Sequence, residues 1–170
     1  MPRTYDLISS NTLGSSTNTV SFTSISSSFT DLVLSISCNG TSSGQDIRIR
    51  FNSDTGTNYS QTYTSGYTSA TSGRSSNATY LQPTNFVGTG GTASESNSLR
   101  VDINKANNTS AHKQILIRNH TIRYLDGYRE VMILGGQYRS LSAISAIEIY
   151  VATGNFATGS IFSLYGITAA

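Results

Sequence analysis

The feature that most constrains this chain is an alternation of apolar and polar residues with a period of two, which returns along most of the sequence. Successive side chains of a β-strand point to opposite faces, so the pattern predicts strands that bury one face. The clearest segment is 46–51, where three apolar residues alternate with Asp46, Arg48 and Arg50. We expect this strand to carry its two arginines on an exposed or interfacial face.

The alternation predicts about ten or eleven strands, which are enough for two packed sheets. The segments are 5–9, 17–25, 31–38, 46–51, 59–64, 78–82, 98–104, 113–118, 129–134, 146–152 and 160–167. Between 52 and 91 the pattern weakens in a stretch rich in Ser, Thr, Gly and Tyr, which predicts strands joined by long loops. Low-complexity disorder is the alternative there, and the tyrosines argue against it because disordered tracts are poor in aromatic residues.

Composition also favours strands and turns over helices. Charged residues make up only 12% of the chain, whereas Ser, Thr, Asn and Gly are abundant throughout. Ser, Thr and Asn side chains compete for backbone hydrogen bonds inside a helix. No repeat, charge run or Pro-rich linker divides the sequence. The prediction is therefore one domain, residues 1–170, with an all-β jelly-roll or a related two-sheet antiparallel β-sandwich of about ten strands.

Charge and cysteine content narrow the classes of partner. The formal net charge is +2 and the basic residues are scattered, so the basic stripe of a nucleic-acid-binding protein is missing. The first residues lack the apolar region of a signal peptide, and no apolar run is long enough to span a bilayer. Cys38 is the sole cysteine, and we expect it to be buried without a disulfide. We expect neither nucleic acid nor membrane as a partner.

Motifs for catalysis or metal binding are weak. Residues 40–44 match the Gly-x-Ser-x-Gly pattern of a nucleophile elbow, but that motif needs a helix that this composition disfavours. A glycosidase needs two facing carboxylates, and the two candidates, Glu130 and Glu148, belong to no recognisable catalytic strand. His112 and His120 have no acidic or cysteine ligand near them in sequence. We expect no enzymatic activity, no cofactor and no metal.

The segment 52–58 is the best candidate for calcium chemistry, since its side chains offer several oxygen atoms in a turn. It contains a single carboxylate, Asp54. A Gly-containing hairpin turn between the strands that end at Phe51 and begin at Tyr59 explains the same residues. We therefore predict a hairpin turn here.

Arginines and tyrosines are the candidate partner contacts. Tyr combines an apolar ring with a polar tip, and Arg is enriched at protein interfaces whereas Lys is depleted. The candidates are Arg48, Arg50, Tyr59, Tyr63, Tyr67 and Tyr80. Further arginines that could contact a partner are Arg118, Arg123, Arg129 and Arg139. Two alternatives remain open: the tyrosines pack in the core, and the arginines are ordinary exposed residues. Trp is absent, which weakens a sugar-stacking interpretation.

Several segments resemble a family of structural proteins from tailed bacteriophages, and the resemblance spans nearly the whole chain. The segments are 5–10, 21–25, 30–34, 51–59 with the Ser/Thr/Gly loop that follows, and 144–167. They are strand and turn motifs, so no catalytic residue is carried over. The resemblance implies a virion component, made in the host cytoplasm and built into the particle.

Within that family, the absence of a heptad or fixed repeat argues against a whole fibre. The first expectation is a capsid decoration, or cement, protein that stabilises the phage head. Its partners would be identical copies, with a trimer favoured, and the major capsid protein or other virion proteins. The alternative is a tail, baseplate or fibre-tip module that binds host-surface polysaccharide.

Overall fold

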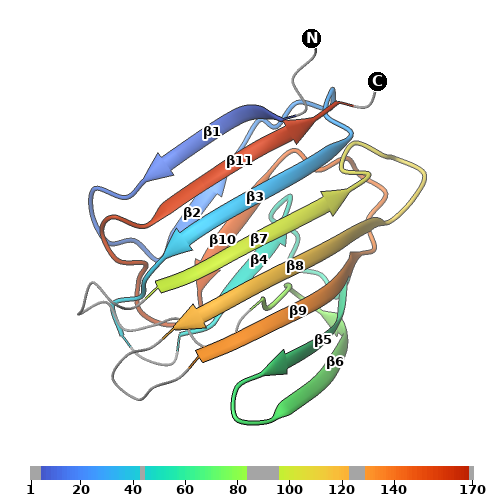
Figure 1. The fold of residues 1–170 in the computed structure, drawn as a ribbon. Coiled ribbons are helices and arrows are strands. Elements are labelled where there is room, and N and C mark those ends of the chain that lie inside the picture. The colour runs from blue at the N-terminus through green and yellow to red at the C-terminus, as the bar shows by residue number, and fades with distance from the viewer. Residues whose placement is uncertain (1–4, 43–44, 84–95, 123–128, 169–170) are drawn as a thin grey trace.

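Every paired strand runs antiparallel to its neighbours in the computed structural model, which describes residues 5–42, 45–83, 96–122 and 129–168. The larger sheet has the order β1 (Asp6–Thr12), β11 (Ile161–Ile167), β3 (Asp31–Cys38), β7 (Ser96–Asn104), β8 (Lys113–Ile122), β9 (Arg129–Tyr138), β5 (Tyr59–Gly66) and β6 (Ala70–Ala78). The smaller sheet has the order β2 (Thr19–Phe22), β10 (Ile147–Val151) and β4 (Ile47–Phe51). In Figure 1 the smaller sheet lies behind the larger one. The predicted two-sheet antiparallel sandwich is confirmed.

The core lies between the two sheets and follows from the alternation. Along β8 buried and exposed residues alternate without interruption from Lys113 to His120. In β4 the buried residues are Ile47, Ile49 and Phe51, so their neighbours face outward. Buried apolar residues of both sheets form one continuous cluster. Removing this apolar surface from water is the main stabilising contribution to the fold.

The segment between β4 and β5 is a crossing from one sheet to the other, and the prediction of a hairpin turn is wrong. β4 pairs only with β10 among the named strands, whereas β5 pairs with β6 and β9. Asn52 and Ser53 both adopt positive φ, at 53° and 54°. Two consecutive residues with positive φ change the direction of the chain sharply. The same Asn, Ser, Asp and Gly residues occur in hairpin turns and in connections between sheets, so the sequence motif does not distinguish the two.

An aromatic cluster holds the two sheets together at this crossing. The rings of Tyr59 and Tyr138 stack with centroids 4.9 Å apart, and Phe51 lies 5.4 Å from Tyr138 and 6.2 Å from Tyr59. The backbone N–H of Phe51 donates a hydrogen bond of 3.0 Å to the Tyr59 hydroxyl. Burial raises the pKa of Tyr59 well above its ordinary value, so the phenol stays neutral and keeps its hydrogen bonds.

Strand β6 was not expected, and the predicted strand 78–82 is mostly absent. All nine residues of β6 are exposed or half-buried, so this edge strand shows no alternation of buried and exposed residues. Leu81 makes a single bridge with Ile49, with backbone hydrogen bonds of 2.9 and 3.0 Å in both directions. Residues 78–82 therefore pair with the free edge of β4 at one position only, Leu81 with Ile49.

The described part of the chain is free of helices. It accordingly has no helix with the length and hydrophobicity needed to cross a bilayer.

Candidate functional site

The outer face of the smaller sheet collects charged and aromatic side chains from two strands. Arg48 and Arg50 lie on β4, and Glu148 and Tyr150 lie on β10. The register pairs Arg50 with Glu148 and Arg48 with Tyr150. Because Ile47, Ile49 and Phe51 occupy the buried face, the alternation places these four residues on the opposite one. They form, with Tyr80, what we call the arginine–tyrosine cluster.

The two guanidinium groups of this cluster stack on tyrosine rings. The Arg48 guanidinium carbon lies 4.3 Å from the centroid of Tyr80, and that of Arg50 lies 4.6 Å from the centroid of Tyr150. The two tyrosine rings meet edge to face, with centroids 6.5 Å apart and planes at 86°. Each cation over an aromatic face contributes about 0.5–1 kcal/mol at an exposed site. The stacking therefore holds both arginines in defined positions.

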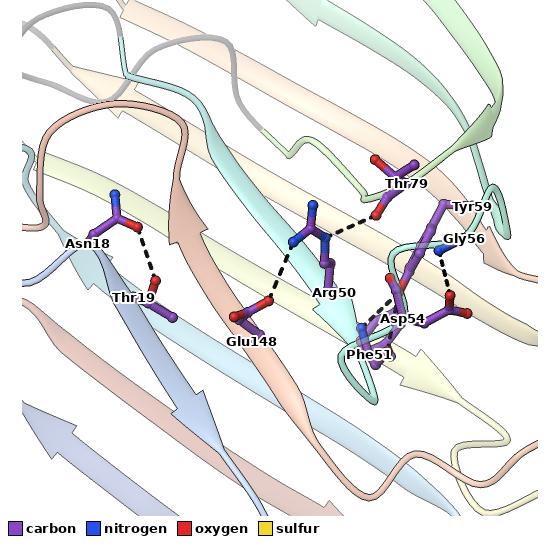
Figure 2. Close-up of polar contacts among 9 residues, drawn as sticks. All are labelled: Asn18, Thr19, Arg50, Phe51, Asp54, Gly56, Tyr59, Thr79 and Glu148. Carbon is purple, nitrogen blue, oxygen red and sulfur yellow. Dashed lines mark hydrogen bonds and ion pairs between the residues drawn. The ribbon is translucent and has the colours of Figure 1, made fainter.

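Arg50 is bound on two further sides, as Figure 2 shows. Its Nη1 lies 3.8 Å from Glu148 Oε2, and its Nε donates a hydrogen bond of 3.2 Å to the Thr79 carbonyl. The charge of Arg50 is thus compensated inside the chain, and its side chain ties the segment before Tyr80 to the smaller sheet. Arg50 stabilises the site rather than presenting a free cation to a partner.

Arg48 has fewer hydrogen-bond partners than Arg50. Its Nε is buried without a hydrogen-bond partner, and so is the hydroxyl of Tyr150. Burial raises the pKa of the nearby Asp46 carboxyl, and the charge of Arg48 opposes that rise. Burial also raises the pKa of Tyr150, so this phenol remains a neutral hydrogen-bond donor.

A hollow of about 370 Å³ opens beside Tyr80. It is lined by Gln61, Ser75, Asn77, Ala78, Thr79, Tyr80 and Gln82. Arg139 fixes one of these side chains by donating a hydrogen bond of 2.8 Å to Asn77 Oδ1. Amide and hydroxyl groups next to an aromatic ring suit a hydroxyl-rich ligand, because they offer both donors and acceptors.

The structure separates the six predicted partner contacts. Arg48, Arg50 and Tyr80 lie together in the cluster. Tyr63 is half-buried, packs against the core and covers Gly73, where an added Cβ would lie 2.6 Å from the Tyr63 hydroxyl. Tyr67 lies in the turn between β5 and β6 and is 47% exposed.

The prediction that Tyr59 contacts a partner is wrong. Its side chain is 0% exposed and belongs to the aromatic cluster between the sheets. The sequence places Tyr59 at the start of the predicted strand 59–64, but its Ser, Thr and Asn neighbours do not indicate that this end of the strand is buried. It also missed Tyr150, although the alternation of the predicted strand 146–152 puts this residue on the outer face with Glu148.

A second surface lies on the outer face of the larger sheet. Leu116 of β8 and Val131 and Ile133 of β9 are 41%, 57% and 48% exposed. The register places Ile133 opposite Arg118 and Val131 opposite His120, so apolar and basic side chains adjoin. We call these five residues the outer patch. Arg118 is held by Asp102, with Nη2 and Oδ2 2.7 Å apart.

The remaining arginine candidates differ in their surroundings. Arg129 is exposed, and Arg139 donates hydrogen bonds to Thr57, Ser60 and Asn77 within the chain. Arg123 lies outside the described residues.

The residues considered for metal binding and catalysis lie apart from one another. Glu130 belongs to the larger sheet and Glu148 to the smaller one, so they do not form a facing pair on one strand ladder. Asp54 accepts hydrogen bonds from Gly56 N, Asn58 Nδ2 and the Tyr138 hydroxyl. Three donors thus occupy the one carboxylate of the turn 52–58. Within the described ranges, no three His, Cys, Asp or Glu residues gather as metal ligands.

Burial raises the pKa of the Cys38 thiol to about 12, which leaves it protonated at neutral pH. A protonated thiol is a poor nucleophile and a poor metal ligand. Of the motif at 40–44, residues 43 and 44 lie outside the described part of the chain.

Comparison with known proteins gives no family assignment: no family model, no curated protein and no solved structure matches this chain.

Proposed function

We propose that this chain is a non-enzymatic structural component of a virion, a capsid decoration protein that binds identical copies and the capsid shell. The observation that carries the proposal is the outer patch on the larger sheet. One face of that sheet packs on the smaller sheet, whereas its other face presents Leu116, Val131 and Ile133 to solvent. The resemblance of the sequence to tailed-phage structural proteins supports the same role.

The chemistry of the outer patch suits a protein contact. Interface cores are apolar and poor in charge except for Arg, and their rims are polar. Here the three apolar side chains adjoin Arg118 and His120, and Ser98 lies opposite His120 on the next strand. A contact of this kind buries the apolar group at its centre and leaves the polar residues at its edge. Copies of a decoration protein are arranged by the symmetry of the particle. A trimer at a three-fold position is therefore the favoured oligomer.

The first experiment measures the mass of the tag-free protein by light scattering and its co-sedimentation with emptied capsids. The Ile133→Ser variant removes the central apolar group, and Leu141→Ser is the control because Leu141 is 50% exposed outside the patch. We expect a trimer that binds capsids, with binding lost for Ile133→Ser and kept for the control. A monomer that ignores capsids would contradict the decoration role.

A second candidate is a tail, baseplate or fibre-tip module that binds host-surface polysaccharide, and the hollow beside Tyr80 favours it. Tyr80 supplies the ring and Gln61 and Asn77 supply amides for sugar hydroxyls. Binding to purified host polysaccharide, measured by calorimetry, tests this role. Tyr80→Ala should abolish the heat, whereas Tyr67→Ala in the β5–β6 turn should leave it unchanged. If Tyr80→Ala lost binding to host polysaccharide but still bound capsids, the hollow beside Tyr80 and the outer patch would act as two separate binding surfaces.

A further inference from the structure

The Arg, Lys, Asp and Glu side chains that are exposed in the described part of the chain all carry positive charge. The exposed basic residues there are Arg74, Arg100, Lys105, Arg118 and Arg129. The acidic residues of the same ranges are all half-buried or buried: Asp6, Asp31, Asp46, Asp54, Asp102, Glu130 and Glu148. The surface formed by the described residues therefore suits an acidic partner.

The four exposed arginines share one face of the larger sheet. Arg118 of β8 and Arg129 of β9 alternate with buried residues, so they lie on the outer face. Arg100 of β7 is directly opposite Arg118. Arg74 of β6 is opposite Thr62, an exposed residue on the same face of β5. The face that carries the outer patch is therefore also the basic face of the described chain.

Arg100 and Arg118 form a directly opposed pair of like charges on this face. Such a pair is unfavourable by itself. Asp102 joins the two, since Arg100 Nε donates to its Oδ1 at 2.9 Å and Arg118 Nη2 donates to its Oδ2 at 2.7 Å. Arg100 Nη2 also donates to the Tyr5 hydroxyl at 3.2 Å. One carboxylate thus holds two guanidinium groups in place, and one positive charge remains uncompensated.

A hollow of about 290 Å³ opens beside this pair and is lined by Ser98, Arg100, Arg118, Asn119, His120 and Val131. Arg100 Nη1 and Arg118 Nε and Nη1 make no hydrogen bond with another described residue. The two arginine side chains are 44% and 55% exposed. Ser98 adds a hydroxyl donor. The hollow therefore offers several donors and a positive charge, which are the groups that a carboxylate binds.

The apolar residues beside the hollow indicate the class of partner. Val131 is opposite His120 and Ile133 is opposite Arg118, so the hollow adjoins the apolar part of the outer patch. A carboxylate of a polysaccharide would leave these apolar side chains in water, whereas a protein partner covers them with its own apolar residues. A second copy fits less well, because its described carboxylates are half-buried or buried.

We propose that the hollow beside Arg100 and Arg118 binds a carboxylate side chain of an acidic partner protein, whose apolar residues cover Val131 and Ile133. This inference rests on the capsid-docking role proposed for the outer patch and adds the charge of the partner surface. Asp102 holds both guanidinium groups before binding, which reduces the entropy lost when the partner docks.

The test is co-sedimentation of the full chain with emptied capsids while sodium chloride rises from about 50 to about 500 mM, which screens exposed charges. Binding should weaken with salt. Arg118→Gln should raise the Kd about 10-fold at low salt, because it removes charge-assisted hydrogen bonds. Lys105→Gln removes the same charge in the turn after β7 and should change the Kd less than about 2-fold. Thermal unfolding checks that both variants fold.

Capsid binding that depends neither on salt nor on Arg118 would overturn the inference and leave the decoration role standing. If the protein ignores capsids, the decoration role fails and fluorescein-labelled poly-L-glutamate decides the inference by fluorescence anisotropy. Binding that is lost in Arg118→Gln would support the carboxylate site, and no binding would overturn it. Tighter binding of polygalacturonate, which presents its carboxylates on a polysaccharide, would overturn the choice of a protein partner.

Discussion

The outer faces of the two sheets differ in whether their side chains make contacts within the chain or are exposed to solvent. On the smaller sheet, the charge of Arg50 is compensated within the chain, because Arg50 contacts Glu148, Thr79 and Tyr150. On the larger sheet, Leu116, Val131 and Ile133 are 41%, 57% and 48% exposed, and no described strand covers them. Substitutions on the first face should therefore change stability. Substitutions on the second should change association and leave stability nearly unchanged.

The largest effect on the free energy of unfolding should come from disrupting the aromatic cluster between the two sheets. Tyr59→Ala deletes a fully buried ring that stacks on Tyr138 and hydrogen-bonds the backbone of Phe51. Large-to-small changes of buried aromatic residues cost about 3–5 kcal/mol. The free energy of unfolding, measured in urea, should fall by that amount. Tyr67→Ala should change it by less than about 0.5 kcal/mol, because Tyr67 is exposed. Equal losses would mean that Tyr59 is not part of the core.

A smaller effect is expected within the arginine–tyrosine cluster. Arg50→Ala removes a stacking contact, a hydrogen bond to a carbonyl and an ion pair, and should reduce the free energy of unfolding by about 1–2 kcal/mol. Arg118→Ala removes a more exposed ion pair with Asp102 on the other face, and should cost less than about 1 kcal/mol. Urea unfolding of both variants compares the two faces directly. If Arg118→Ala lowered the free energy of unfolding more than Arg50→Ala, side chains on the outer face of the larger sheet would contribute more to stability than those on the smaller sheet, contrary to expectation.

Acid should weaken the crossing between the sheets. Partial burial alone would raise the pKa of Asp54, but hydrogen bonds from Asn58, Gly56 and Tyr138 outweigh it and hold the pKa below its ordinary value. A lowered folded pKa means that the stabilisation is present above the unfolded pKa, about 3.9, and is lost as the pH falls through the folded value. Asp54→Asn should flatten the decline in Tm below about pH 4 relative to the wild-type chain. An unchanged profile would show that other carboxylates cause the decline.

The smallest effect on stability is expected at the outer patch. Ile133→Ser and Val131→Ser should change the free energy of unfolding by less than about 0.5 kcal/mol, because exposed positions tolerate substitution. The same variants should lower the mass observed by light scattering if the patch joins copies. A loss of several kcal/mol would mean that the patch supports the fold of the monomer and would remove the contrast between the two faces.

Alternation allowed most strands to be predicted because each buries one face, and β3 was predicted with its observed bounds, Asp31–Cys38. β6 could not be predicted in the same way, since an edge strand exposed along most of its length needs no apolar residues. For the arginine–tyrosine cluster, the sequence indicated Arg48, Arg50 and Tyr80. Their meeting depends on the sheet order and on the bridge at Leu81, which no local pattern encodes.

Buried polar residues were the hardest to interpret from the sequence. Asn97 and Asn119 lie just outside the predicted strands 98–104 and 113–118, because polar side chains typical of surfaces end the apolar pattern there. The observed strands continue through them and bury both residues, as well as Glu130. Thr, Asn and Ser are so common in this chain that a few of them on a buried face do not stand out. Only the register shows that Asn97 and Glu130 both lie opposite Thr121 on neighbouring strands.

The bridge between Leu81 and Ile49 bears on how the protein behaves at high concentration. Unpaired strand edges attract strands from other molecules and promote aggregation. Leu81 uses its own N–H and C=O on Ile49, so the free edge of β4 is blocked where its residues are most apolar. β6, at one edge of the larger sheet, contains Arg74 among Ser, Thr and Gly residues, which lack the apolar side chains that stabilise strand stacking. Sheet edges protected in this way should disfavour edge-to-edge aggregation and leave association to side-chain contacts on the faces.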